Sequence, residues 1–156
     1  MYSVKKINFW NLFALGKIVG ILYRCGKDMT KKYDLQHWNN SRLKNWIIVA
    51  MCVVKNEIYL VFDEKSAVAT FQVRKTKDAL LFSKLATSPD FAGRGIGTFC
   101  MEKIEQMARE CGSASVICEV YDKSNHAISF YERKGYAVYG TVETLKYTEL
   151  KMIKTL

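Results

Sequence analysis

The stretch Phe91-Ala92-Gly93-Arg94-Gly95-Ile96-Gly97-Thr98 carries three alternating glycines between a strand-like apolar run and an amphipathic helix pattern. Glycine has no Cβ, so a turn built from it exposes several backbone N–H groups. The helix that follows adds its own unpaired N–H groups and a partial positive charge. Together these features predict an anion site, most often one for phosphate or pyrophosphate.

Two common phosphate loops do not fit this stretch. A Walker A loop, GxxxxGK[ST], needs a lysine before its last residue, and here Thr98 follows Gly97 directly. A dinucleotide fingerprint, GxGxxG, fits Gly93 and Gly95 but meets Thr98 where its third glycine belongs. The spacing therefore disfavours nucleoside triphosphates and dinucleotides as ligands.

The periodicity of apolar residues predicts strands and helices in the order βααβββαβαββ. The segment 27–40 is polar and is expected to be a loop. The expected strands cover 1–7, 57–62, 67–74, 79–87, 115–121, 136–144 and 145–153. The first expected helix starts at Asn8 and has apolar positions through Leu22. The other three cover 42–54, with Ser41 as the cap, 95–111 and 124–134.

Length and composition predict one compact cytoplasmic domain. The chain has 156 residues, and a hydrophobic content of 49% is enough for a sizeable core. Lys17 interrupts the apolar run 7–23, no cleavage site follows it, and the run 46–54 is too short for a bilayer, so we expect no membrane partner. The five cysteines form no CxxC pair and are expected to be reduced core thiols rather than metal ligands.

The positive charge is concentrated in the first third of the chain. The net charge is +9, and residues 1–55 alone contribute ten basic and two acidic residues. This excess is either a solvated surface or a source of attraction for an acidic partner: a phosphorylated cofactor, an acidic substrate or RNA.

A second motif lies thirty residues downstream of the glycine loop, at Asn125-His126-Ala127-Ile128-Ser129-Phe130-Tyr131-Glu132-Arg133-Lys134-Gly135-Tyr136. It is close to N-x-x-A-x-x-F-Y-x-x-x-G-F/Y, with one residue fewer between the asparagine and the alanine. Gly95-Ile96-Gly97 fits the second half of the pattern Q/R-x-x-G-x-G/A. Both patterns belong to the GNAT-type N-acetyltransferases, which the whole chain, 1–156, resembles as a single domain. The Q/R position falls on Ala92, so a phosphate there would rest on backbone N–H groups and Arg94.

The resemblance implies an α+β fold with a mixed, mostly antiparallel, twisted sheet that splays apart between its fourth and fifth strands. Acetyl-CoA would lie in that opening as a co-substrate, and no metal is implied. Phe130 would pack near the thioester, or it would only pack in the hydrophobic core. The cofactor-binding residues it implies are Leu85, Ala86 and Thr87 for the pantetheine, Gly93, Arg94, Gly95, Ile96, Gly97 and Thr98 for the pyrophosphate, and Asn125, Phe130 and Tyr131 beside the pantetheine arm.

The resemblance also assigns catalytic roles. Tyr131 would donate a proton to the departing CoA thiolate, since a phenol with a pKa near 10 can hydrogen-bond a thiolate whose own pKa is roughly 8.5. Glu119 is a candidate general base, with a surface carboxylate as the alternative interpretation. Water relayed through backbone carbonyls, His37 and a solvated His126 are the other options for the base.

The acceptor is expected to be a primary amine of a small molecule, an amino-acid derivative or a peptide or protein, attacking directly in a ternary complex. The basic first third disfavours a polycation, because like charges repel. As an alternative acceptor, the enzyme could acetylate an aminoacyl-tRNA. As an alternative to an enzyme, the chain could be an acyl-CoA-binding sensor or interaction module without catalysis. A homodimer through the last strands is also compatible with the resemblance.

Overall fold

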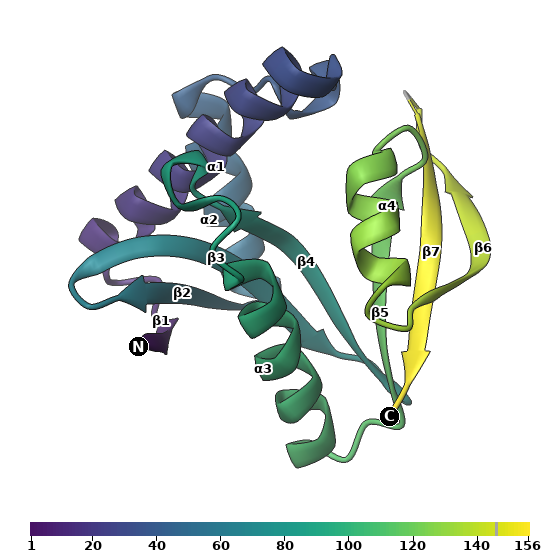
Figure 1. The fold of residues 1–156 in the computed structure, drawn as a ribbon. Coiled ribbons are helices and arrows are strands. Elements are labelled where there is room, and N and C mark those ends of the chain that lie inside the picture. Colours follow the sequence, from purple (N-terminus) through teal and green to yellow (C-terminus); the bar gives the residue numbers. More distant parts are fainter. Residues whose placement is uncertain (146) are drawn as a thin grey trace.

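The chain forms one seven-stranded sheet with helices on both faces (Figure 1). The computed structural model describes residues 1–145 and 147–156, and of His37 it describes the backbone alone. The strands are β1 (Tyr2–Ile7), β2 (Glu57–Asp63), β3 (Ser66–Lys75), β4 (Ala79–Thr87), β5 (Ser115–Tyr121), β6 (Ala137–Glu143) and β7 (Thr148–Thr155). The helices are α1 (Leu12–Tyr33), α2 (Arg42–Lys55), α3 (Ile96–Glu110) and α4 (Asn125–Glu132), with short 3-10 helices η1 (Gln36–Trp38) and η2 (Pro89–Phe91).

The sheet has the strand order β1-β2-β3-β4-β5-β7-β6. Its neighbours pair antiparallel except β4 and β5, which pair parallel. The mixed, mostly antiparallel sheet and the element order expected from the sequence are therefore confirmed. Adjacent β4 and β5 are joined through α3, as a parallel crossover requires.

Side-chain alternation along the strands divides the core into two clusters on opposite faces of the sheet. On β2, Ile58 and Leu60 belong to the cluster under α1 and α2, whereas Val61 belongs to the cluster under α3 and α4. The helices are amphipathic and bury their apolar stripes against these strand residues.

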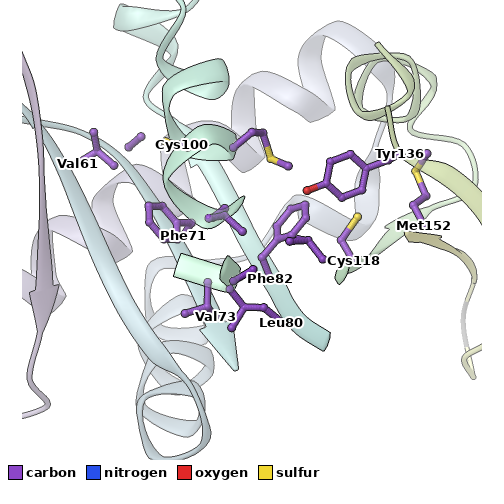
Figure 2. Close-up of a cluster of buried hydrophobic side chains, with 14 of the residues drawn as sticks. Val61, Phe71, Val73, Leu80, Phe82, Cys100, Cys118, Tyr136 and Met152 are labelled. Atoms are coloured by element: carbon purple, nitrogen blue, oxygen red, sulfur yellow. The ribbon is translucent and has the colours of Figure 1, made fainter. Parts of the chain in front are cut away.

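The cluster under α3 and α4 joins the two halves of the molecule (Figure 2). Phe82 of β4 meets Tyr136, which precedes β6, edge to face with ring centroids 6.0 Å apart. Cys100 of α3, Cys118 of β5 and Met152 of β7 are buried around this contact. Packing on this face therefore ties the first four strands to the last three.

The first helix differs from the expectation at both ends. It is capped by Asn11, whose side chain accepts a hydrogen bond from Ala14 N, and not by Asn8. It also continues to Tyr33, so the expected loop over 27–40 is wrong for its first seven residues. The polar side chains there lie on the solvent face of the helix, where Lys32 and Asp28 pair at 2.9 Å.

The other expected boundaries agree with the structure to within a few residues. Ser41 caps α2 as predicted, because its Oγ accepts a hydrogen bond from Lys44 N at 3.1 Å. The last strand starts at Thr148 rather than at residue 145, since Thr144 and Tyr147 close the turn before it.

Candidate active site

The sheet opens between β4 and β5. Within the residues that the structure describes, their pairing covers 79–81 against 115–117 and goes no further, and Figure 1 shows the strands diverging beyond it. A β-bulge accounts for the divergence: Phe71 of β3 faces both Lys84 and Leu85 of β4, and Lys84 has a φ of 52°. Since a bulge bends its strand, the end of β4 turns away from β5. The predicted splay is confirmed.

The glycine loop presents a row of backbone donors at the start of α3. Gly93 and Gly95 both have a φ of 77°, a conformation that other residues rarely adopt. Gly95 is the N-cap of α3 and provides no side-chain cap, and the first helical hydrogen bond runs from Phe99 N to Gly95 O. For the N–H groups of 93–98 no acceptor is found in 1–145 and 147–156. The loop thus fits an anion such as a pyrophosphate.

Contacts to distant elements fix the loop in place. Tyr2 of β1 donates a hydrogen bond from its hydroxyl to the carbonyl of Arg94 at 3.0 Å. The Arg94 guanidinium lies 5.1 Å from the centre of the Phe91 ring, and Arg24 of α1 pairs with Asp90 at 3.4 Å. The Arg94 side chain is exposed, so it is available to a phosphate.

The two sequence motifs meet in space. Phe130 of α4 packs on the first turn of α3, so closely that a Cβ on Gly97 would lie 3.3 Å from its Cζ. Phe130 also packs against the core cluster under α3 and α4, in agreement with the core alternative for it. Asn125, at the start of α4, is exposed.

Tyr131 lies on the inner side of α4, over β4. Its ring contacts Phe82 edge to face at 5.5 Å and Tyr136 at 6.1 Å. Burial raises the pKa of the Tyr131 phenol well above its ordinary value, so the hydroxyl keeps its proton at neutral pH. Tyr131 as a whole is only partly buried, which leaves it accessible to a ligand in the opening.

Two carboxylates lie together on β5 and β7. Tyr121 is paired with Glu149 and Glu119 with Lys151, and paired residues share a face, so Glu119 and Glu149 are diagonal neighbours. Burial and the charge of Glu119 raise the pKa of Glu149, and the Lys84 ammonium opposes this shift. Lys84 itself lies 5.5 Å from the ring centre of Trp38. The bulge of β4 and η1 thus face the carboxylates across the opening.

Tyr131 and Glu119 lie on opposite sides of the sheet. Cys118 and Val120 of β5 point into the cluster that contains Tyr131, and Glu119 between them must point the other way. A molecule that meets both side chains must therefore pass through the plane of the sheet. The opening between β4 and β5 is the place where the sheet allows this.

One of the two histidines, His126, is placed differently from the expectation. His126 is half-buried and stacks on Tyr33 of α1, with ring centroids 4.3 Å apart and an interplanar angle of 3°. Burial lowers its pKa, so the expected solvated position is wrong. The side chain of His37 lies outside the described part of the chain.

The sequence model of the Acetyltransferase (GNAT) family matches residues 16–136, which include the glycine loop, all of α4 and the whole motif over 125–136. The chain belongs to this family. No curated protein matches the chain. GNAT enzymes are acetyl-CoA-dependent acetyltransferases, so family membership makes this chain an N-acetyltransferase whose acceptor is unknown.

Solved structures share the GNAT fold over almost the whole chain. A PaiA N-acetyltransferase from Thermoplasma acidophilum, in complex with coenzyme A, has 13% identity and a TM-score of 0.80, covering 100% of this chain and 99% of that one. The ribosomal-protein-S18-alanine N-acetyltransferase from Escherichia coli has 15% identity and a TM-score of 0.74, covering 99% and 94%. An acetyltransferase from Thermus thermophilus has 15% identity and a TM-score of 0.75, covering 100% and 97%.

Sequence reasoning missed several residues of this GNAT site. Tyr2 supports the glycine loop from β1, and no local pattern marks it. Lys84 occupies a bulge that is typical of glycine and gives no signal when lysine fills it. Glu149 could be found only through the register between β5 and β7, which joins residues thirty positions apart.

Proposed function

We propose that this GNAT enzyme transfers the acetyl group of acetyl-CoA to a primary amine by direct attack in a ternary complex, with Tyr131 as acid and Glu119 as base. The observation that carries this proposal is the placement of Tyr131 and Glu119 on opposite faces of the sheet, at its opening. Acyl donor and acceptor would enter from the two faces and meet between the strands.

The donor would be held largely by backbone. The N–H groups of 93–98 suit the pyrophosphate, and the exposed Arg94 adds a positive charge. Beyond the last pair with β5, the edge of β4 at Leu85, Ala86 and Thr87 would pair with the amide groups of the pantetheine. Asn125 would bind the same arm from the start of α4.

Glu119 and Tyr131 would handle the two protons of the reaction. Glu119 would take a proton from the acceptor ammonium, which frees the nitrogen lone pair to attack the thioester carbon. Tyr131 would donate a proton to the sulfur as the carbon–sulfur bond breaks, and solvent would restore it. The attacking nitrogen would lose its second proton to solvent as the amide forms, so that acetyl-CoA and the ammonium give the amide, the free thiol and one net proton.

The charges around the opening support an acceptor with an ammonium next to a polar group. Glu119 and Glu149 provide two carboxylates for the ammonium. Lys84 stands across from them and would meet a carbonyl or carboxylate oxygen. An amino-acid derivative or the N-terminus of a peptide carries both groups, and a simple alkylamine carries only one.

The test is CoA release from acetyl-CoA with a panel of alkylamines, amino-acid amides and short peptides. We expect turnover with the amides and peptides, and a loss of about 100-fold in the Glu119→Gln variant. Glu102→Gln, on the exposed side of α3, is the matched control and should keep full activity.

Binding of acetyl-CoA is measured separately by calorimetry. Tight binding without turnover of any amine would identify a sensor module and overturn the enzymatic proposal. Full activity of Glu119→Gln would instead remove that residue as the base and leave water as the proton acceptor.

A further inference from the structure

The outer face of α2 is apolar and exposed to solvent. The helix buries Asn45 and Val49 toward the sheet, and its opposite side carries large apolar side chains at spacings of three and four residues. Val54, for example, is 83% exposed. These side chains are Leu43, Trp46, Ile47, Met51 and Val54, and the small exposed Ala50 lies among them.

The surface continues onto the start of α1. Trp46 packs over α1, where a Cβ on Gly16 would lie 3.7 Å from its ring. At the other end of α2, Val53 lines the same hollow as Phe9 and Trp10. Together, the six α2 side chains and four at or just before the start of α1 form what we call the apolar face; the four are Phe9, Trp10, Leu12 and Phe13.

Basic residues surround the apolar face. Arg42 lies on one side of the α2 stripe and Lys44 and Lys55 lie on the other, and α2 contains no acidic residue. On α1, Lys17 lies 4.9 Å from the ring centre of Phe13. Glu57, at the edge of the face, is paired with Lys6 at 2.6 Å and adds no net charge.

We propose that the apolar face docks on an anionic lipid surface, with α1 and α2 lying in the plane of the interface. Four of its ten side chains are Trp or Phe, the residues that prefer the boundary between lipid and water. A rim of Lys and Arg around such a face is the composition of interfacial helices that bind anionic lipids.

The charge of the rim argues against a second copy of this chain as the occupant. Two copies joined through this face would bring their basic rims together with no acidic residue of α2 to offset them. In Figure 1 the start of α1 lies on the far side of the molecule from α4, β5 and β7. The apolar face itself therefore does not cover the opening between β4 and β5.

We expected no membrane partner because no segment of the sequence is suited to span a bilayer. Of the helices described, none is both long and apolar enough to cross a bilayer. A face that lies on the membrane needs no such segment, because only one side of each helix enters the interface.

The test is co-sedimentation of the full chain with phosphatidylcholine vesicles, with and without phosphatidylglycerol. We expect binding to the anionic vesicles, at least a tenfold weaker affinity for neutral ones, and loss of binding at high salt. Trp10→Ser/Phe13→Ser/Met51→Ser should bind anionic vesicles at least tenfold more weakly. Val138→Ser/Tyr139→Ser, which removes two exposed apolar side chains of β6, is the matched control and should bind like the parent.

Charge is tested by Lys44→Glu/Lys55→Glu against Lys77→Glu/Arg133→Glu, which alters exposed residues elsewhere. Only the first pair of substitutions should weaken binding to anionic vesicles. This pair also tests the proposal if the triple serine variant fails to fold. Absence of binding to anionic vesicles at low salt would overturn the proposal. So would a dimer in sedimentation velocity that the apolar substitutions dissolve, because a second copy would then be the occupant.

Discussion

The Tyr131 hydroxyl carries a firmly held proton, because burial raises the pKa of this phenol. If it donates to the departing thiolate, its loss should slow the chemical step and spare the binding of the donor. We expect Tyr131→Phe to lower kcat by about 100-fold and to change the Kd for acetyl-CoA by no more than about twofold. Steady-state kinetics and calorimetry measure the two quantities. Tyr139→Phe, on the exposed strand β6, is the control, and unchanged turnover of Tyr131→Phe would assign that ring to packing alone.

Gly97 tests the contact between the two motifs. A methyl group at this position would press on Phe130, so Gly97→Ala should displace α4 relative to the loop. We expect acetyl-CoA to bind about tenfold more weakly, as measured by calorimetry. Gly20→Ala is the control, because its Cβ would meet nothing within 4 Å. It should keep the affinity and raise stability by about 0.5 to 1 kcal/mol; equal affinities in both variants would contradict the placement of the donor.

At the scale of elements, α1 is tied to the segment that follows it by a close backbone approach. A Cβ on Gly26 would overlap the carbonyl oxygen of Trp38, so this glycine is what allows η1 to pack on the helix. We expect Gly26→Ala to lower the free energy of unfolding by about 1 to 3 kcal/mol in urea titrations. Because Lys84 contacts Trp38, the KM for the acceptor should also rise. If Gly26→Ala were as stable as Gly20→Ala, η1 could move away from α1 without loss of folding free energy, and the expectation would be wrong.

The elements differ in how far the sequence determines them. The strands and α2 could be predicted, because local periodicity and the Ser41 cap mark them directly. The second half of α1 could not, since its polar residues resemble a loop and Gly26 is there for a tertiary contact. The bulge at Lys84 gives no sequence signal, although it sets the opening of the sheet.

The site could be predicted in part for the same reason. The glycine loop and the Asn125–Tyr136 motif are local and were found with their correct elements. The relation of Glu119 to Tyr131 and Glu149 depends on strand register and on which face each residue occupies. Such relations arise from pairing between distant segments, which periodicity does not report.

At the scale of the whole molecule, buried thiols couple stability to alkaline pH. Burial raises the pKa of Cys100 and Cys118 from 9.0 to about 12, and that of Cys25 to about 11. A thiol whose pKa is raised in the folded protein contributes stability that is fully present below pH 9.0. This stability is lost as the pH rises toward the pKa of the thiol in the folded protein. We expect the free energy of unfolding to fall by roughly 1 kcal/mol per buried thiol between about pH 8 and about pH 10.

Guanidinium titrations at the two pH values measure this loss. Cys100→Ala/Cys118→Ala should be less stable at neutral pH and should show a flatter pH dependence than the parent. An identical slope in both proteins would attribute the alkaline loss to other groups, such as the buried tyrosines, whose raised pKa values have the same sign.

The three residue pairs that join β4 to β5 give the acyl donor a second role. A ligand hydrogen-bonded along β4 and held by α4 would act as a missing length of strand and lock the two halves against separation. Each increase in its concentration above Kd would then add to the folding free energy by mass action. The lifetime of the enzyme in a cell would follow the supply of acetyl-CoA, so that scarcity of the donor would lead to faster proteolysis of the enzyme that consumes it.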